Sequence, residues 1–182
     1  MDHVAELALD RHLDTIRRAP RDVATIELIV RRPGVDQREV VTEAVLDTVE
    51  GLVGDCWKAR GSKSMPDGVA NPESQVTLMS TRVLAAIEAD RSRWPLAGDQ
   101  LYVDLDITIE HLPAGTQLAI GDAIVVISEK PHTGCAKFTE RFGSEATRWV
   151  NSPTGRELRL RGMNVRVVQS GTIRTGDTVR RI

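Results

Sequence analysis

The chain has 182 residues, of which 41% are hydrophobic and 27% are charged, and its formal net charge is −2. This is the composition of an ordinary globular domain, and without an excess of cations it does not favour nucleic acid as a partner. No apolar run approaches the roughly 18 residues that a membrane span needs, and aromatic residues, at 3%, are too scarce for a surface that stacks single-stranded nucleic acid.

The first residues are polar and lack the basic and apolar regions of a secretion signal. The two cysteines, Cys56 and Cys135, are too few for a disulfide framework. We therefore expect a protein of the reducing cytoplasm with no membrane partner.

The N-terminal segment shows a loose helical spacing of apolar residues from Val4 to Arg18, which stops at Pro20. The pattern changes to that of a strand from Val23. We expect residues 1–20 to form a helical extension and residues 21–182 to form the main domain.

Short β-branched segments separated by glycine turns follow, and they predict strands. The expected strands are residues 24–30 and 39–46, paired through a turn at Pro33-Gly34, then 75–79, 101–103, 106–109, 117–120, 123–127, 164–169, and short segments at 173 and 178–179. The two-residue connection Gly121-Asp122 suits a type II′ hairpin turn.

Two further helices are expected, one after Ser80 and one after Cys135. The second has an apolar face that should pack on the sheet, formed by Phe138, Phe142, Ala146, Trp149 and Val150. The sequence therefore predicts a mainly β fold with helices, of the α+β class: a mixed, closed or nearly closed β-barrel decorated by about three helices. No linker separates the early strands from the late ones, so we expect one barrel.

A long segment rich in Gly, Ser, Lys and Pro interrupts the strands between Lys58 and Asn71. Its cationic residues are Lys58, Arg60 and Lys63. Long loops inside a domain tend to be functional or disordered. Two interpretations stay open: a mobile flap near the mouth of a site, which contacts an anionic ligand, and a solvated loop.

The chemically most informative residue is Cys135, at the expected start of a helix. Unpaired N–H groups and the positive end of the helix dipole favour a thiolate there, and we expect His132, Lys137 and Arg141 to add positive charge. The alternative is a buried structural cysteine. We expect Cys135, and not Cys56, to be the reactive thiol, because Cys56 follows the negative charge of Asp55.

Seven short motifs in a fixed order around Cys135 resemble the MOSC family, named after the C-terminal domain of molybdenum cofactor sulfurases. The resemblance covers roughly Val23 to Ile182. The motifs are Gly51-Leu52-Val53-Gly54-Asp55, Gln75-Val76-Thr77-Leu78-Met79, Leu112-Pro113-Ala114-Gly115, Ile120-Gly121-Asp122, Cys135 itself, Arg161-Gly162 with Arg166-Val167-Val168, and Gly171 to Val179.

The resemblance implies a mixed β-barrel, a pocket for a pterin phosphate, and a cysteine that carries sulfur as a persulfide or contacts a molybdenum cofactor (molybdopterin). Cys135 matches the family's cysteine, and we assign catalysis to Cys135 with His132 as its proton shuttle. Cys135 is also the expected molybdenum ligand. The residues expected to bind the cofactor are Lys58, Arg60, Lys63, Thr133, Gly134, Lys137, Arg141 and Arg161.

One segment departs from the family, whose members often carry an Asn-Leu pair where this chain has Asp99-Gln100-Leu101-Tyr102-Val103-Asp104, so we do not expect the family's ligand contacts there. The chain also shows no lysine domain for pyridoxal phosphate, so we expect the sulfur donor to be another protein, such as one that resembles a cysteine desulfurase.

Three functions remain open: a sulfur-transfer enzyme, a non-catalytic module that binds the molybdenum cofactor, and a module that only docks a partner. We do not expect zinc, because Cys56, His132 and Cys135 would supply only three ligands.

Overall fold

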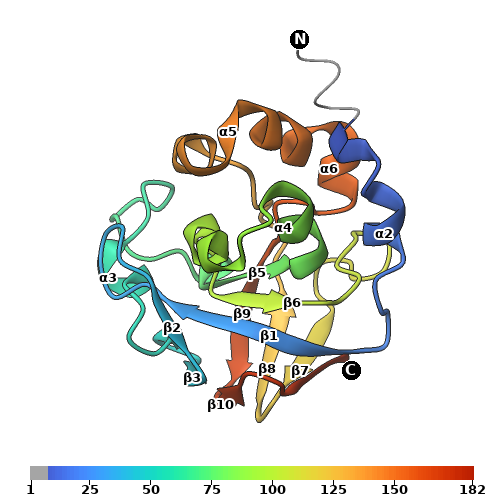
Figure 1. Ribbon diagram of the computed structural model, residues 1–182. Helices are drawn as coiled ribbons and strands as arrows, with labels where there is room; N and C mark the ends of the chain where they lie inside the picture. Colours follow the sequence, from blue (N-terminus) through green and yellow to red (C-terminus); the bar gives the residue numbers. More distant parts are fainter. Residues whose placement is uncertain (1–7) are drawn as a thin grey trace.

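Seven β-strands close into a barrel in the computed structural model, which describes residues 8–182 (Figure 1). Around the barrel the order is β1, β11, β7, β8, β9, β5, β6 and back to β1. The strands β5 and β6 run parallel and their neighbours antiparallel, so the barrel is mixed, as predicted. Its strands are β1 (Val23–Arg31), β5 (Val76–Ser80), β6 (Leu101–Val103), β7 (Gln117–Ile120), β8 (Ala123–Ile127), β9 (Met163–Gln169) and β11 (Thr178–Arg181).

The predicted strand over residues 39–46 is wrong in part, because the chain breaks at Thr42. Its first half is β2 (Glu39–Val41), which extends the barrel sheet beside β1. Its second half, β3 (Glu43–Asp47), joins a separate three-stranded sheet with β4 (Gly51–Leu52) and β10 (Gly171–Arg174). The carbonyl of Thr42 accepts a hydrogen bond from the backbone N–H of Thr175, which holds the break.

Aliphatic side chains fill the barrel, because alternate residues of each strand point inward. On β5, Val76 and Leu78 belong to this interior core while Met79 belongs to an outer one. The interior core is one continuous cluster whose members come from both the early and the late strands, including Ile26, Leu118, Val125, Val165 and Val179. We expected the strands from Val23 to Leu46 and from Gln117 to Val179 to build one barrel. This is confirmed for β1, β7, β8, β9 and β11, whereas β3 and β10 lie in the separate three-stranded sheet.

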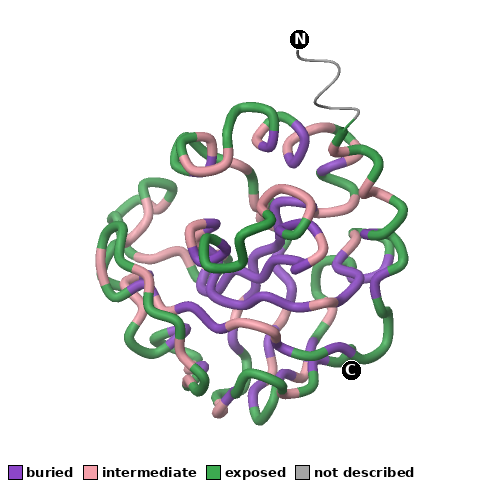
Figure 2. The backbone as a smooth tube through the Cα atoms, in the orientation of Figure 1, coloured by how far each residue is buried: buried purple, intermediate pink, exposed green. Residues whose placement is uncertain are grey.

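Helices cover one outer side of the barrel and form the second apolar layer (Figure 1). They are α2 (Leu13–Arg17), α4 (Thr81–Ile87), α5 (Ala136–Asn151) and α6 (Pro153–Glu157), with the 3₁₀ helix η2 (Arg91–Ala97). Strands β1, β5 and β6 send Val30, Met79 and Tyr102 into this layer. The strands β5 and β6 are therefore buried on both faces, and β1 is buried on both faces only at Ile29 and Val30 (Figure 2). The short helix α3 (Trp57–Arg60) overlaps the start of the predicted loop and η1 (Pro72–Ser74) directly follows its end, so the chain has more helices than we expected.

The predicted apolar face of α5 is confirmed. Phe138, Ala146, Trp149 and Val150 are buried in the outer layer, and Phe142 packs partly against it. Gly143 interrupts the helix with a φ of 88°, which divides it into two parts that the sequence did not predict.

The predicted strand over residues 106–109 is wrong. The backbone N–H of Thr108 donates to the carboxylate of Asp106 at 3.0 Å, and Leu112 N–H donates to the carbonyl of Thr108. Such local side-chain and turn bonds compete with strand pairing.

The predicted N-terminal helix begins at Val4, outside the described residues, and the described part is helical at residues 8–10 and in α2. The hairpin turn at Gly121 is confirmed: its φ is +52°, and a side chain there would lie 2.9 Å from the carbonyl oxygen of Thr172. Among the described residues, no helix has the length and apolarity to cross a membrane.

Candidate functional site: a cationic cavity beside Cys135

A cavity of about 320 Å³ opens between the start of α5, the segment after β8 and the loop that follows β1. Seven lysine and arginine side chains line it, and none of its lining residues is acidic. We call it the cationic cavity. Its basic residues are Arg32, Arg38, Arg60, Lys130, Lys137, Arg141 and Arg161, and His132, Thr133 and Cys135 also line it.

Cys135 lies at the edge of this cavity as the residue that precedes α5. It is exposed, so the alternative of a buried structural cysteine is wrong. Its carbonyl accepts the backbone N–H of Thr139 at 3.0 Å, while its side chain makes no capping hydrogen bond. The thiol is therefore placed to meet a ligand.

A buried ionic network supports the floor of the cavity. Asp99 is fully buried, and one of its carboxylate oxygens accepts from Nη1 of Arg161 at 2.6 Å. Its other oxygen bonds Nε2 of His132 at 2.9 Å. Arg161, 5% exposed, also donates to the carbonyl of Ala97 at 2.8 Å and lies over the ring of Phe138, 4.8 Å from its centroid. Asp99 thus joins two residues of the cavity wall.

The backbone beside Arg161 allows this close approach. Gly162 has a φ of +94°, and a Cβ there would lie 2.4 Å from the carbonyl oxygen of Leu78 on β5. Only glycine adopts this positive φ without strain and has no Cβ that would collide with the carbonyl oxygen of Leu78. The Arg161-Gly162 pair in the sequence is therefore needed to bring the guanidinium against β5 and Asp99.

The pKa values in this network follow from burial and charge. Burial alone would raise the pKa of Asp99, but Arg161 and His132 outweigh it and hold that pKa at about 2. Burial, helped by Arg161, lowers the pKa of His132 although Asp99 opposes the shift. His132 is therefore neutral at neutral pH, a departure from the cationic role that we expected. An ionised carboxylate only accepts, so Nε2 of His132 carries the proton and Nδ1 is left with a lone pair.

The lowered pKa of His132 predicts how stability depends on pH. The unfolded chain binds a proton near pH 6.5 and the folded chain only at lower pH, so stability is lost as pH falls below about 6.5. We expect His132→Gln to flatten this part of the curve of unfolding free energy against pH, measured by urea titration. If the unfolding free energies of the wild type and His132→Gln depended on pH with the same slope below pH 6.5, a lowered pKa of His132 would be contradicted.

The other cations of the cavity are only partly neutralised. Arg32 pairs with Asp55 through two hydrogen bonds of 2.8 and 2.9 Å, and Lys137 and Arg141 both donate to Asp36 at 2.7 Å. Among the described residues, three basic side chains of the cavity have no carboxylate partner, namely Arg38, Arg60 and Lys130.

Arg38 carries the clearest sign of excess positive charge. It donates to the carbonyl oxygens of Pro95 and Gln37, which bear no full charge. Burial lowers the pKa of Arg38, and the like charges of Arg141 and Arg32 lower it further. An anion in the cavity would relieve this repulsion.

The structure brings together most of the residues predicted for the site. His132, Thr133, Cys135, Lys137, Arg141, Arg161 and Arg60 all line the cationic cavity. Gly134 does not line it, and its backbone is bonded to the side chain of Asn151 instead. Lys58 pairs with Glu50, and Lys63 is not on the lining. Of the cationic loop, only Arg60 therefore reaches the cavity mouth, and the mobility of that loop stays a prediction.

Sequence reasoning missed four residues of this region: Arg32, Arg38, Lys130 and Asp99. Arg32 and Arg38 flank the turn at Pro33-Gly34, and two arginines beside a turn were a usable signal. Lys130 is two residues from His132 and could have been included on proximity. The only sequence signal for Asp99 was its place at the start of the segment that departs from the family pattern.

Comparison with known proteins gives the family. The family model described as the MOSC domain matches residues 66–180, more than half of the chain. The chain belongs to the MOSC domain family. No curated protein matches this MOSC chain closely enough to assign its activity.

Solved structures share the fold of this MOSC chain at low sequence identity. One is the YuaD protein from Bacillus subtilis, with a TM-score of 0.63, 14% identity and coverage of 86% of this chain and 94% of that one. YiiM from Geobacillus stearothermophilus has a TM-score of 0.60 and 15% identity, with coverage of 87% of this chain and 75% of that one. YiiM from Escherichia coli has a TM-score of 0.57 and 16% identity, with coverage of 87% of this chain and 69% of that one. Among the described residues of this MOSC chain, no cluster of three or more His, Cys, Asp or Glu could hold a metal ion by itself.

Proposed function

We propose that the cationic cavity binds a phosphate-bearing molybdenum cofactor, with Cys135 as the thiolate that contacts the metal. The observation that carries the proposal is the composition of the cavity: seven basic side chains, no acidic one and an exposed cysteine at the edge. A phosphate suits the cations, and a soft thiolate suits molybdenum. Membership of the MOSC family supports the choice of cofactor.

The residues present fit such a group. Arg38, Arg60 and Lys130 are the cavity cations without a carboxylate partner in the described chain, so they would hold the phosphate most directly. Nε of Arg161 is a buried donor with no partner in the described structure, and Arg161 lines the same cavity. When bound, the cofactor would supply redox chemistry at the metal. The chain's own contribution is to bind the anion, place the thiol and hold the proton of His132 at Nε2.

The anion-binding part of the proposal is tested with pyrophosphate as a probe, by calorimetric titration. We expect binding to the wild-type chain, and at least about tenfold weaker binding to Arg38→Gln, because a hydrogen bond to a charged group contributes about 1.5–3 kcal/mol. Arg174→Gln is the matched control, since this arginine lies on β10 and pairs with Glu43. Equal affinities for the wild type and Arg38→Gln would contradict the proposal.

A second candidate function is favoured by the exposure of Cys135. An accessible thiolate can attack the outer sulfur of a donor persulfide. The new S–S bond forms as the donor's S–S bond breaks, and the donor leaves as a thiolate with no net oxidation. We propose a donor such as a cysteine desulfurase-like protein. His132, through the lone pair on Nδ1, would take the proton of the Cys135 thiol.

Persulfide formation is measured by peptide mass spectrometry after reaction of the reduced, folded protein with polysulfide. We expect one added sulfur atom on the peptide that contains Cys135, and none on the peptide that contains Cys56. The variant Cys56→Ser should behave as the wild type, whereas Cys135→Ser should take up no sulfur. Labelling of Cys56 in preference to Cys135 would rule out the sulfur-carrier role of Cys135.

A further inference from the structure

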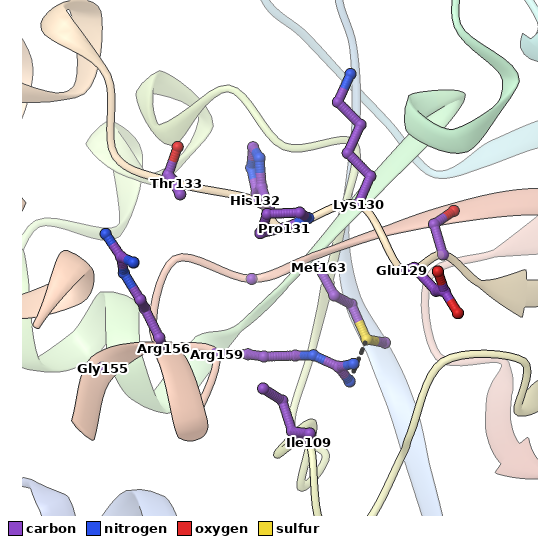
Figure 3. A pocket seen from close by; sticks show the side chains of 12 residues that line it. Ile109, Glu129, Lys130, Pro131, His132, Thr133, Gly155, Arg156, Arg159 and Met163 are labelled. Atoms are coloured by element: carbon purple, nitrogen blue, oxygen red, sulfur yellow. Dashed lines mark hydrogen bonds between the residues drawn. The ribbon is translucent and has the colours of Figure 1, made fainter. Parts of the chain in front are cut away.

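A second, smaller pocket of about 200 Å³ lies next to the cationic cavity and shares with it only the segment from Lys130 to Thr133 (Figure 3). The side chains of Lys130 and His132 point away from Ile109 and Arg159 in this pocket, and they bond Ser74 and Asp99 instead. We call it the Arg159 pocket. The proposed function does not use this pocket.

Arg159 is the central polar group of this pocket. Its backbone has a φ of +49°, a left-handed conformation that is unusual for an arginine. The guanidinium is held by one nitrogen, Nη1, which donates to the carbonyl oxygens of Leu112 at 2.6 Å and Ile107 at 3.2 Å. The same nitrogen lies 3.7 Å from the sulfur of Met163, the contact drawn in Figure 3.

The rest of this guanidinium has no partner in the described part of the chain. Nε and Nη2 make no hydrogen bond there, and no carboxylate pairs with Arg159. Burial lowers the pKa of Arg159, which shows that its charge is partly desolvated. The free Nε–Nη2 edge of a guanidinium matches the two oxygens of a carboxylate. An unpaired, partly desolvated cation of this kind favours an anionic ligand.

A second unpaired group lies on the same pocket. Ser128 is 6% exposed, and its hydroxyl has no hydrogen-bond partner among the described residues. Buried hydroxyl groups are normally satisfied, so an orphaned one on a pocket wall points to a missing partner. The backbone of Ser128 is fixed by the bond from its N–H to the carbonyl of Asn164, so its position does not depend on the ligand.

The remaining wall is largely apolar, because Ile109, Pro131 and Met163 line it. Figure 3 places the Ile109 side chain beside the guanidinium of Arg159. The acidic residue on the lining, Glu129, is exposed, so water screens its charge. The volume is below the roughly 300–1,000 Å³ of pockets for drug-sized ligands, which limits the occupant to a small molecule.

We infer that the Arg159 pocket binds a small organic carboxylate: a short apolar body against Ile109, Pro131 and Met163, with its carboxylate on the free edge of Arg159. An inorganic anion would leave the apolar wall uncovered, and an uncharged apolar molecule would leave the guanidinium unpaired.

The inference is tested by NMR titration of the isotope-labelled full chain with isocaproate. We expect resonance shifts at residues of the Arg159 pocket, and at least about tenfold weaker binding of isocaproamide, which lacks the charge. Inorganic phosphate, added in a separate titration, should not shift Ile109, Ser128, Arg159 or Met163 at similar concentrations, because these residues line the Arg159 pocket and not the cationic cavity. Equal affinities for acid and amide, or shifts by phosphate at the same residues, would overturn the assignment to an organic carboxylate.

Two sets of variants assign the binding to Arg159. Arg159→Gln should weaken isocaproate binding at least about tenfold, and Arg174→Gln, which makes the same charge change on β10, should not. Arg159 also supports the loop at Leu112, so Ile109→Glu gives a test that leaves the arginine in place. The carboxylate introduced by Ile109→Glu should pair with the guanidinium of Arg159 and weaken isocaproate binding, whereas the neutral Ile109→Gln should weaken isocaproate binding less. Unchanged binding in Arg159→Gln, or equal effects of the two Ile109 variants, would overturn the inference.

Discussion

Replacing Asp99 by asparagine is expected to lower the free energy of unfolding by about 3–5 kcal/mol, the usual cost of breaking a buried ion pair. Both oxygens of the fully buried Asp99 accept hydrogen bonds, one from Arg161 and one from His132. An asparagine has a single acceptor oxygen, so one of these donors would face an amide N–H and the charge of Arg161 would be left uncompensated. Urea unfolding at neutral pH measures the loss.

Asp36→Asn is the matched control for this change. Asp36 also joins two cations, Lys137 and Arg141, but it is exposed. Exposed ion pairs contribute about 0–1 kcal/mol, so the control should lose far less stability than Asp99→Asn. Equal losses for the two variants would contradict the view that the Asp99 network supports the cavity.

The pKa of Asp99 predicts the pH at which its advantage disappears. The folded-state pKa of about 2 lies below the ordinary value of 3.8, so its stabilising effect is present above about pH 4 and is lost as pH falls toward 2. The shift corresponds to roughly 2 kcal/mol. The difference in stability between the wild type and Asp99→Asn should therefore shrink over this range, which acid titration of both proteins can follow.

The fold was predictable where local patterns decide it. The hairpin of β7 and β8 has aliphatic strands on either side of the Gly121-Asp122 turn, and both strands and turn are as expected. The pattern at residues 106–109 was equally strand-like, but the carboxylate of Asp106 accepts a hydrogen bond from the backbone N–H of Thr108, and no strand forms there. A hydrophobicity pattern does not report that competition.

The break at Thr42 was not predictable either, because the partner that captures β3 is β10, more than a hundred residues away. The choice between extending the barrel and joining a second sheet depends on that distant strand.

The part of the site around Cys135 was predictable from neighbouring residues, whereas Arg161 was predicted only from the family motif and Arg60 only from the cationic loop. Residues 132–141 are neighbours in the sequence, so their charges could be seen to converge. Asp99 pairs with Arg161 across 62 residues, and this contact depends on the closed barrel.

The departure from the family at Asp99-Gln100-Leu101 also has a structural explanation. The side-chain oxygen of Gln100 accepts from the backbone and the hydroxyl of Thr77, at 2.9 and 2.7 Å, so Gln100 ties η2 and β6 to β5. Asp99, one residue earlier, faces the cavity wall. Of these two adjacent residues, Gln100 therefore stabilises the barrel and Asp99 stabilises the wall of the candidate site.

Loss of bound cofactor from Cys135→Ser is the second large effect that we expect. A serine hydroxyl keeps the size of the side chain but is a hard oxygen ligand that stays protonated, so it replaces a thiolate poorly at molybdenum. Cys56 is half-buried and does not line the cationic cavity, so Cys56→Ser is the matched control. Cys135 is exposed and its side chain makes no capping bond, so its replacement should leave the fold intact.

The most direct test is a parallel analysis of molybdenum and pterin in the wild type, Cys56→Ser and Cys135→Ser, each purified from a host that makes the cofactor. Our account predicts both components in the wild type and in Cys56→Ser, and their loss from Cys135→Ser with an unchanged unfolding curve. Wild-type protein without molybdenum and pterin, or equal contents in the two variants, would contradict it.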